Sequence, residues 1–191
     1  MHMGEAIMES SFVQTLLDCI QAFMTSVVAF MILGPVGFIL GELFPRKWVH
    51  YDSFPFNEFK WEKSGEIYRK LRINEWKDRV PDMSILFKWM FPKQGISQSR
   101  SSDYFRRFVI ETCVAEAVHV LLMIAGYVVY VFVYPNPWGF IASTLYALGN
   151  LPFVLIQRYN RPRFKLIMQR QQQIDERKKQ LESKRAQQEE K

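Results

Sequence analysis

The segment ETCVAEAVHVLL, residues 111–122, places two carboxylates and a histidine at the start of a long apolar stretch. Ionisable side chains inside a membrane segment are costly, so they are expected to be paired or functional. At about 100° per residue, Thr112, Glu116 and His119 share one face of a helix. Glu116 and His119 are three residues apart, close enough for their side chains to touch. A carboxylate that accepts a hydrogen bond from an imidazole orients it as a general base, so the spacing favours acid–base chemistry.

The same polar face has a plainer explanation, because helix–helix hydrogen bonds could satisfy it without any catalytic role. His119 lies about two turns into the apolar zone, which is deep for so short a side chain to reach the membrane surface. We therefore predict that Glu111, Glu116 and His119 are catalytic.

A second polar cluster lies in GNLPFVLIQRYNRPRF, residues 149–164, at the end of another apolar stretch. If the two apolar stretches form a helical hairpin, this cluster lies beside Glu111 and Glu116. Its arginines can then neutralise the carboxylates, bind phosphate or stabilise an oxyanion, because a guanidinium presents a planar set of donors. Pro162 is expected to shape a turn where the chain leaves the membrane. The polar members of the cluster are Gln157, Arg158, Tyr159, Asn160, Arg161 and Arg163.

Three apolar segments are long enough to cross a membrane as helices. Residues 19–41 contain no charged side chain, and at about 1.5 Å per residue they span a hydrocarbon core of about 30 Å. Residues 108–134 and 138–157 follow, joined by a short Pro-Asn-Pro turn. The sequence predicts an all-α membrane protein, with a single membrane-embedded domain over residues 1–170 and a charged tail, helical or disordered, over residues 171–191.

The cations indicate how the chain is oriented. Fourteen Lys and Arg lie between Arg46 and Arg107 and 11 between Arg158 and Lys191, which accounts for all 25. With three spans, both blocks fall on one side of the membrane, and the positive-inside rule makes that side cytoplasmic. We expect a multi-pass protein with its N-terminus outside and with its large loop and C-terminus in the cytoplasm.

The cytoplasmic loop mixes aromatic residues with dense charge. Ser64–Asp78 is predicted as one amphipathic helix, with Ile67, Leu71 and Asn74 along one face. Tryptophans such as Trp76 suit the membrane interface, where cations can reach lipid phosphates. A collar that only anchors the protein would have the same composition, so a binding role for this loop remains one of two alternatives.

Other chemistries find no support in the residues. Cys19, Cys113 and three histidines form no ligand cluster, so we expect no metal site and no cofactor. No H-x-x-x-x-D motif, G-x-S-x-G elbow or glycine-rich phosphate loop occurs. The basic blocks are assigned to the membrane surface, so no nucleic-acid partner is expected.

The two polar segments together resemble the small membrane acyltransferases of the staphyloxanthin pathway, the glycosyl-4,4′-diaponeurosporenoate acyltransferase family. That family's pattern reads E-T-x-x-A-E-x-x-H-W, followed by N-x-P-x-x-x-x-Q-R-Y-N-R-P-R-L. The sequence departs from it at Val120 and Phe164, where the pattern has Trp and Leu, and the loop segment LRINEWKDRVPD is also similar. The resemblance covers roughly residues 20–170. The matching positions are Glu111, Thr112, Ala115, Glu116, His119, Asn150, Pro152, Gln157, Arg158, Tyr159, Asn160, Arg161, Pro162 and Arg163.

The resemblance implies that a fatty acyl chain is moved, from acyl-CoA, to a sugar hydroxyl of a membrane glycolipid such as a glycosylated carotenoid. It also implies a bacterial cell membrane, with membrane lipids and the two substrates as partners. His119 would serve as the base, and arginines of the second cluster as oxyanion donors. The expected substrate-binding residues are Thr112, Asn150, Gln157, Arg158, Tyr159, Asn160, Arg161, Arg163, Arg72, Asn74, Trp76 and Lys77.

Two other interpretations stay open. A non-catalytic membrane protein could use the same polar cluster to hold a lipid headgroup or a partner's helix, and a different lipid-modifying transferase would differ only in its substrate. A homodimer is also compatible with the sequence, because Gly34, Gly37 and Gly41 have spacings that permit close helix contact. Kinking of the first helix near Pro35 explains these glycines almost as well.

Overall fold

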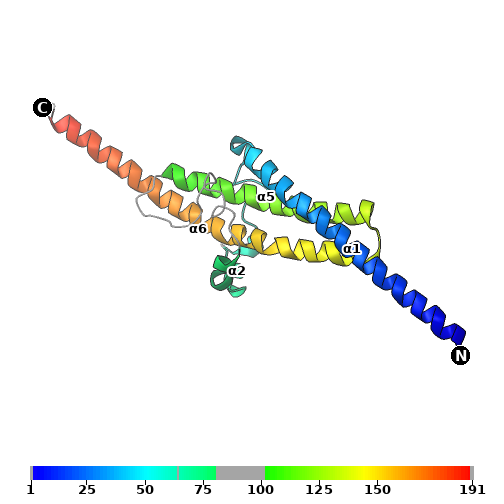
Figure 1. Ribbon diagram of the computed structural model, residues 1–191. Coiled ribbons are helices and arrows are strands. Elements are labelled where there is room, and N and C mark those ends of the chain that lie inside the picture. The colour runs from blue at the N-terminus through cyan, green and yellow to red at the C-terminus, as the bar shows by residue number, and fades with distance from the viewer. Residues whose placement is uncertain (1, 64, 81–101, 190–191) are drawn as a thin grey trace. The chain divides into compact units, whose positions relative to one another are not determined.

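The computed structural model describes residues 2–63, 65–80 and 102–189, and every regular element in these ranges is helical. Among the described residues there are three long helices and a group of short ones, whose course can be followed in Figure 1. The long helices are α1 (His2–Leu43), α5 (Ser102–Val133) and α6 (Pro137–Glu189). The short helices are η1 (Arg46–Trp48), η2 (Lys60–Glu62), α2 (Glu66–Lys70), α3 (Ile73–Trp76) and η3 (Lys77–Arg79).

The three long helices confirm the predicted membrane architecture, since each is long and apolar enough to cross a membrane. Their ends differ from the prediction, because all three continue beyond the apolar segments. The turn expected at Pro162 is wrong: α6 runs through this proline and stays helical to Glu189. A proline inside a helix costs about 3 kcal/mol or more. Burial of the neighbouring aromatic side chains of Tyr159 and Phe164 acts against that cost.

The helices belong to two compact units, and α5 and α6 each contribute to both. The first unit comprises Met1–Phe44 and Ala117–Pro152, and the second comprises Pro45–Glu116 and Phe153–Lys191.

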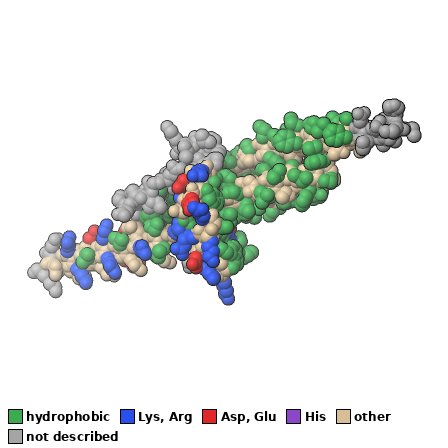
Figure 2. All heavy atoms as spheres, turned by 90° about the horizontal axis from the view of Figure 1, so that it is seen from below, with side chains coloured by type: hydrophobic (Ala, Val, Ile, Leu, Met, Phe, Trp, Pro, Cys, Tyr) green, Lys and Arg blue, Asp and Glu red, His purple; other side chains and the backbone are tan. Residues whose placement is uncertain are grey.

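Small residues allow the helices of the first unit to approach closely. A Cβ atom on Gly126 would lie 2.8 Å from the ring of Tyr146, and one on Gly37 would lie 2.9 Å from Leu122. The Ser143 hydroxyl donates to the carbonyl of Gly126 at 2.8 Å, which adds an interhelical hydrogen bond. Such packing, rather than exclusion of water, holds helices together in lipid. The outward side chains of this unit are mainly hydrophobic, as Figure 2 shows for one face.

The turn between α5 and α6 is built as the Pro-Asn-Pro sequence predicts. Asn136 precedes α6, and its side-chain oxygen accepts a hydrogen bond from the backbone N–H of Gly139 at 2.8 Å. Asparagine is among the residues that best cap the first turn of a helix, where backbone N–H groups lack intrahelical partners. The cap fixes where α6 begins and so sets the hairpin.

The loop of the second unit does not form the single amphipathic helix predicted over Ser64–Asp78. Arg72 adopts a left-handed conformation with φ of 53°, which ends one short helix and begins the next. The break turns different side chains inward: Tyr68 and Ile73 are buried against Tyr159, whereas Leu71 is exposed. Packing against α6 therefore overrides the helical periodicity of this segment. In Figure 2, Lys and Arg side chains gather over the second unit.

The glycine packing generates a stability prediction for the first unit. We expect Gly126→Ala to lower the unfolding free energy by about 1–3 kcal/mol, because the new methyl group meets the Tyr146 ring. The matched control is Gly149→Ala, where nothing lies within 4 Å of the added atom. That change should be neutral or stabilising by up to about 1 kcal/mol, because alanine favours a helix. Thermal unfolding in detergent measures both, and equal effects would contradict the packing argument.

Candidate functional site

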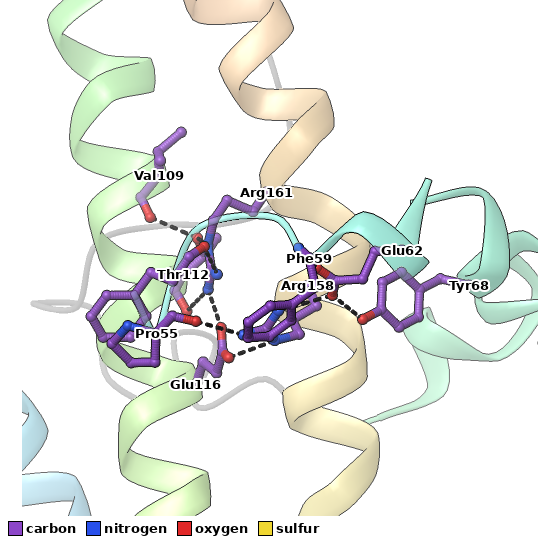
Figure 3. Close-up of polar contacts among 10 residues, drawn as sticks. Pro55, Phe59, Glu62, Tyr68, Val109, Thr112, Glu116, Arg158 and Arg161 are labelled. Atoms are coloured by element: carbon purple, nitrogen blue, oxygen red, sulfur yellow. Dashed lines mark hydrogen bonds and ion pairs between the residues drawn. The ribbon is translucent and has the colours of Figure 1, made fainter. Parts of the chain in front are cut away.

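A network of buried charged side chains joins the loop of the second unit to α5 and α6. We call it the carboxylate–guanidinium network, and Figure 3 shows how the side chains of its members point towards one another. Its members are Glu62 of η2, Tyr68 of α2, Glu116 of α5, and Arg158 and Arg161 of α6.

Arg158 is the bridge between the two carboxylates. Its Nε donates to Glu116 Oε1 at 2.7 Å, and its Nη1 donates to Glu62 Oε1 at 2.9 Å. The remaining nitrogen, Nη2, donates to the carbonyl of Pro55 at 2.7 Å. The guanidinium also lies 4.5 Å from the centre of the Phe59 ring, in cation–π range. All three nitrogens of Arg158 therefore contact acceptors of the protein itself.

Arg161, one helical turn further on, secures the other oxygen of the same carboxylate. Its Nη2 donates to Glu116 Oε2 and also, at 3.2 Å, to the carbonyl of Thr112. Nε donates to the Thr112 hydroxyl at 3.2 Å, and Nη1 donates to the carbonyl of Phe56 at 2.9 Å. The Thr112 hydroxyl in turn donates to Val109 O at 2.6 Å. Thr112 thus orients Arg161 through both its side chain and its backbone.

The charges of the network balance, with two carboxylates facing two guanidinium groups. Glu62 is 3% exposed and Glu116 and Arg161 are each 4% exposed, so water contributes little to their solvation. Pairing is then required, because an isolated buried charge is very unfavourable. This confirms that cations of α6 offset the cost of Glu116. Every nitrogen of both guanidinium groups already donates to an acceptor of the protein itself.

Glu62 and Tyr68 show how strongly the site favours the ionised carboxylate. Burial alone raises the pKa of Glu62, but hydrogen bonds from Tyr68, from the Phe59 amide and from Arg158 outweigh it and hold that pKa below its ordinary value. The pKa of Tyr68 is raised, first by burial and then by its hydrogen bond to Glu62, so the phenol stays protonated and continues to donate.

Glu111 has a separate partner, Arg46, which follows α1. Nε and Nη2 of Arg46 each donate to one oxygen of Glu111 at 3.1 Å, a two-point contact, and Arg107 lies 3.9 Å away. The α6 cluster was expected to lie beside both glutamates. It contacts Glu116, whereas the ion pairs of Glu111 come from Arg46 and Arg107.

His119 belongs to the first unit, where it meets Asn150. Its Nδ1 lies 2.9 Å from Asn150 Oδ1, and Asn150 Nδ2 donates to the carbonyl of Tyr146 at 2.9 Å. Asn150 is 8% exposed and His119 is half-buried. The predicted orienting partner of His119 was Glu116, both of whose oxygens are held by arginines. The structure thus gives the imidazole a neutral amide partner.

The other candidate binding residues fall into two groups. On α6, Tyr159 is buried in the core with Tyr68. The Arg163 guanidinium lies 3.7 Å from the centre of the Tyr159 ring. Gln157 and Asn160 are half-buried on the same helix.

The loop candidates mainly contact the loop itself. Arg72 pairs with Glu75 at 2.7 Å, Lys77 pairs with Asp78 at 2.7 Å, and Trp76 Nε1 donates to Leu71 O at 3.1 Å. Asn74 is exposed on α3. In the described residues no three of His, Cys, Asp or Glu form a group that could hold a metal ion.

Sequence reasoning missed Glu62 and Arg46 as members of these clusters. Neither lies in a periodic segment, so no helical spacing pointed to them. For Arg46 the available signal was that Glu111 and Glu116 require counter-charges, for which the strongly basic loop was the nearest additional source. No such signal pointed to Glu62. The backbone carbonyls of Pro55 and Phe56 could not be anticipated, because carbonyl positions depend on the path of the loop.

Comparison with known proteins agrees with the resemblance stated above. A family model for glycosyl-4,4′-diaponeurosporenoate acyltransferase matches residues 45–170. A protein of that name from Staphylococcus haemolyticus is 32% identical over 131 residues, covering 68% of this chain and 74% of the relative. One from Staphylococcus aureus, strain bovine RF122 / ET3-1, is 27% identical over 125 residues, covering 65% of this chain and 74% of the relative. No solved structure matches the chain.

The apolar helices and the family match together define the chain as a membrane acyltransferase, and therefore an enzyme. It belongs to the glycosyl-4,4′-diaponeurosporenoate acyltransferase family.

The network predicts that Glu116 contributes strongly to stability. Glu116→Gln should lower the unfolding free energy by about 3–5 kcal/mol, because two guanidinium groups lose a buried counter-charge. Glu75→Gln is the matched control, since it breaks an exposed Glu–Arg pair worth about 0–1 kcal/mol. Thermal unfolding of both variants in detergent tests this, and a Glu116→Gln protein as stable as the control would contradict the network's role.

Glu62 generates a prediction about acid. The pKa of Glu62 is lower in the folded protein than its ordinary value of 4.5. Ionised Glu62 therefore stabilises the folded protein fully when the pH is above 4.5. The contribution is lost as pH falls through the folded pKa, where the carboxylate becomes protonated. Unfolding followed between pH 6 and 3 should therefore show a steeper loss of stability for the native protein than for Glu62→Gln.

Tyr68→Phe provides an intermediate case for the acid experiment. It keeps the Glu62 carboxylate and its bond to Arg158 but removes one donor, so the acid-dependent loss should shift towards higher pH. Identical pH profiles for the native protein and both variants would contradict the lowered pKa of Glu62.

Proposed function

We propose that this acyltransferase moves a fatty acyl group from acyl-CoA to a sugar hydroxyl of a glycosylated carotenoid or related glycolipid, with His119 as general base. Membership of the family supports the acceptor, because the relatives are named for a glycosylated diaponeurosporenoate. The observation that supports His119 is its hydrogen bond to Asn150 within apolar helices.

The proposed step is an acyl transfer by addition and elimination. The sugar hydroxyl attacks the carbonyl carbon of the thioester while His119 Nε2 accepts its proton. The tetrahedral intermediate then collapses, the C–S bond breaks, and the imidazolium returns the proton to the leaving thiolate. A positioned base of this kind contributes about 10²–10⁴-fold to the rate. Glu116 and Glu111 would act on this site only indirectly, by holding the arginines that bind them.

The lipid substrates suit the exposed surface of the first unit. Large apolar side chains such as Phe23, Met31, Leu121 and Leu145 are more than half exposed, as expected for helices in contact with lipid. A glycolipid acceptor and a fatty acyl chain can approach such helices from within the bilayer. Phosphates of acyl-CoA would suit the Lys and Arg of the loop and tail, which we assign to the cytoplasmic side of a bacterial membrane with the N-terminus outside.

A non-catalytic lipid-binding protein is the second candidate. One observation favours it: the arginines of the carboxylate–guanidinium network bind acceptors of the protein itself, as expected for a structural core. The two candidates differ at His119, because an amide can replace an imidazole as a hydrogen-bonding group but cannot serve as a base at neutral pH.

The test compares membranes containing the native protein, His119→Gln or His50→Gln, supplied with labelled acyl-CoA and a carotenoid glycoside. We expect the native protein to form an acylated glycoside, identified by mass spectrometry, and His119→Gln to lose about 10²–10⁴-fold in rate. His50→Gln is the control, since His50 is exposed in the loop, where its Nδ1 contacts Trp48 O. Undiminished transfer by His119→Gln would exclude the base, and lipid binding without any transfer would favour the second candidate.

A further inference from the structure

We infer that Asn150 is a positioning residue that fixes the tautomer of His119, so that Nε2 is the nitrogen that accepts the substrate's proton. The inference rests on the proposed function, because it specifies how the proposed base is held. Asn150 was expected from the sequence to bind substrate directly. Its contacts in the structure point to a different role.

The orientation of the Asn150 amide follows from its two contacts. One end lies 2.9 Å from the backbone carbonyl of Tyr146, which can only accept a hydrogen bond. The NH₂ group must therefore face Tyr146, because an amide oxygen there would place two acceptors together. The amide oxygen is then directed to His119 Nδ1, also at 2.9 Å.

The tautomer of His119 follows in turn. Because Asn150 Oδ1 is an acceptor, Nδ1 of the imidazole must carry the hydrogen. A neutral imidazole has a single N–H group, so the lone pair that can take a proton is on Nε2. Without this partner, histidine favours the opposite tautomer, with hydrogen on Nε2 and the lone pair on Nδ1.

The surroundings of Asn150 hold the amide in place. It is 8% exposed on α6, and its bond to the carbonyl four residues earlier ties the side chain to its own helix. The ring of Tyr146, in that same turn, stacks on Phe30 of α1 with ring centres 3.9 Å apart and planes 9° apart. The turn that carries Asn150 is thus held against α1 as well as against α5.

A neutral partner also suits an apolar setting better than a carboxylate. An amide orients the imidazole without adding a buried negative charge, which would need its own counter-ion. When His119 takes up a proton, Asn150 Oδ1 continues to accept from Nδ1, so the hydrogen bond is kept through the proposed step. Asparagine has this orienting role beside histidine in papain-like proteases, on an unrelated fold.

The direct test is the ¹⁵N NMR spectrum of the detergent-solubilised full chain, labelled in its histidine rings. The His119 signals are identified by their loss in His119→Gln, since the chain has only three histidines. We expect native His119 to show a protonated Nδ1 and an unprotonated Nε2. In Asn150→Leu, which removes the acceptor at similar volume, the hydrogen should move to Nε2. In Asn150→Asp, a buried carboxylic acid can donate to Tyr146 and accept from Nδ1, so the native tautomer should return.

Activity measured on the same proteins completes the test. Asn150→Leu should lower kcat by about 10-fold or more with KM little changed, and Asn150→Asp should recover part of that loss. The matched control is Thr144→Val. Like the Asn150 amide, the Thr144 hydroxyl donates to a carbonyl four residues earlier on α6, here that of Phe140 at 2.8 Å, and the substitution removes this hydroxyl. It should change neither the tautomer nor kcat.

The possible failures are distinguishable. A native His119 with hydrogen on Nε2 would overturn the inference, and so would an unchanged kcat in Asn150→Leu despite a changed tautomer. Failure of the proposed function would appear instead as undiminished transfer by His119→Gln, whatever the tautomer of the native protein.

Discussion

The contact between Glu116 and two arginines of α6 is the interaction on which the second unit depends. A carboxylate this deeply buried is tolerated only when opposite charges and hydrogen bonds satisfy both its oxygens. Arg158 and Arg161 are three residues apart, so they lie on one face of α6 and can reach the same carboxylate together. Each arginine has further donors, and these bind the loop at Pro55, Phe56 and Glu62. These ion pairs therefore hold the loop in place and also hold α5 against α6.

This dependence explains why the α6 motif combines charge with aromatic residues. Arg158 and Arg161 contact Glu116, while Tyr159 between them is buried in the cluster with Tyr68 and Ile73. The hydroxyl of Tyr68 donates to Glu62, which accepts from Arg158 as well. Tyr68 thus takes part in both the apolar packing and the carboxylate–guanidinium network, which couples the two sets of contacts. A loop without long regular elements is held in one conformation by this arrangement.

The sequence predicted the parts of this structure that depend on repeated patterns. Uncharged segments such as residues 19–41 predicted the helices, and the hairpin expected from the short Pro-Asn-Pro turn predicted that Glu116 meets the α6 arginines. The helix over Ser64–Asp78 was predicted wrongly, because its periodicity was real but Tyr159 packs against Tyr68 and Ile73 instead. The end of α6 was wrong at Pro162, because a local rule about proline neglected the buried neighbours that compensate for it. The pairing of His119 with Asn150 depends on the register of two helices, which spacing within one helix cannot specify.

The two polar clusters of this enzyme have different chemical consequences. In the carboxylate–guanidinium network, each charge is balanced and each guanidinium nitrogen has an acceptor, so a proton moved within it would leave a buried charge without its partner. The His119–Asn150 pair contains no carboxylate, and its hydrogen bond joins an imidazole nitrogen to an amide oxygen. Under the proposed function, proton transfer at His119 would break no buried carboxylate–guanidinium pair, because its partner is an amide. The charged cluster is therefore suited to hold the fold, whereas the chemistry that we propose is assigned to the His119–Asn150 pair.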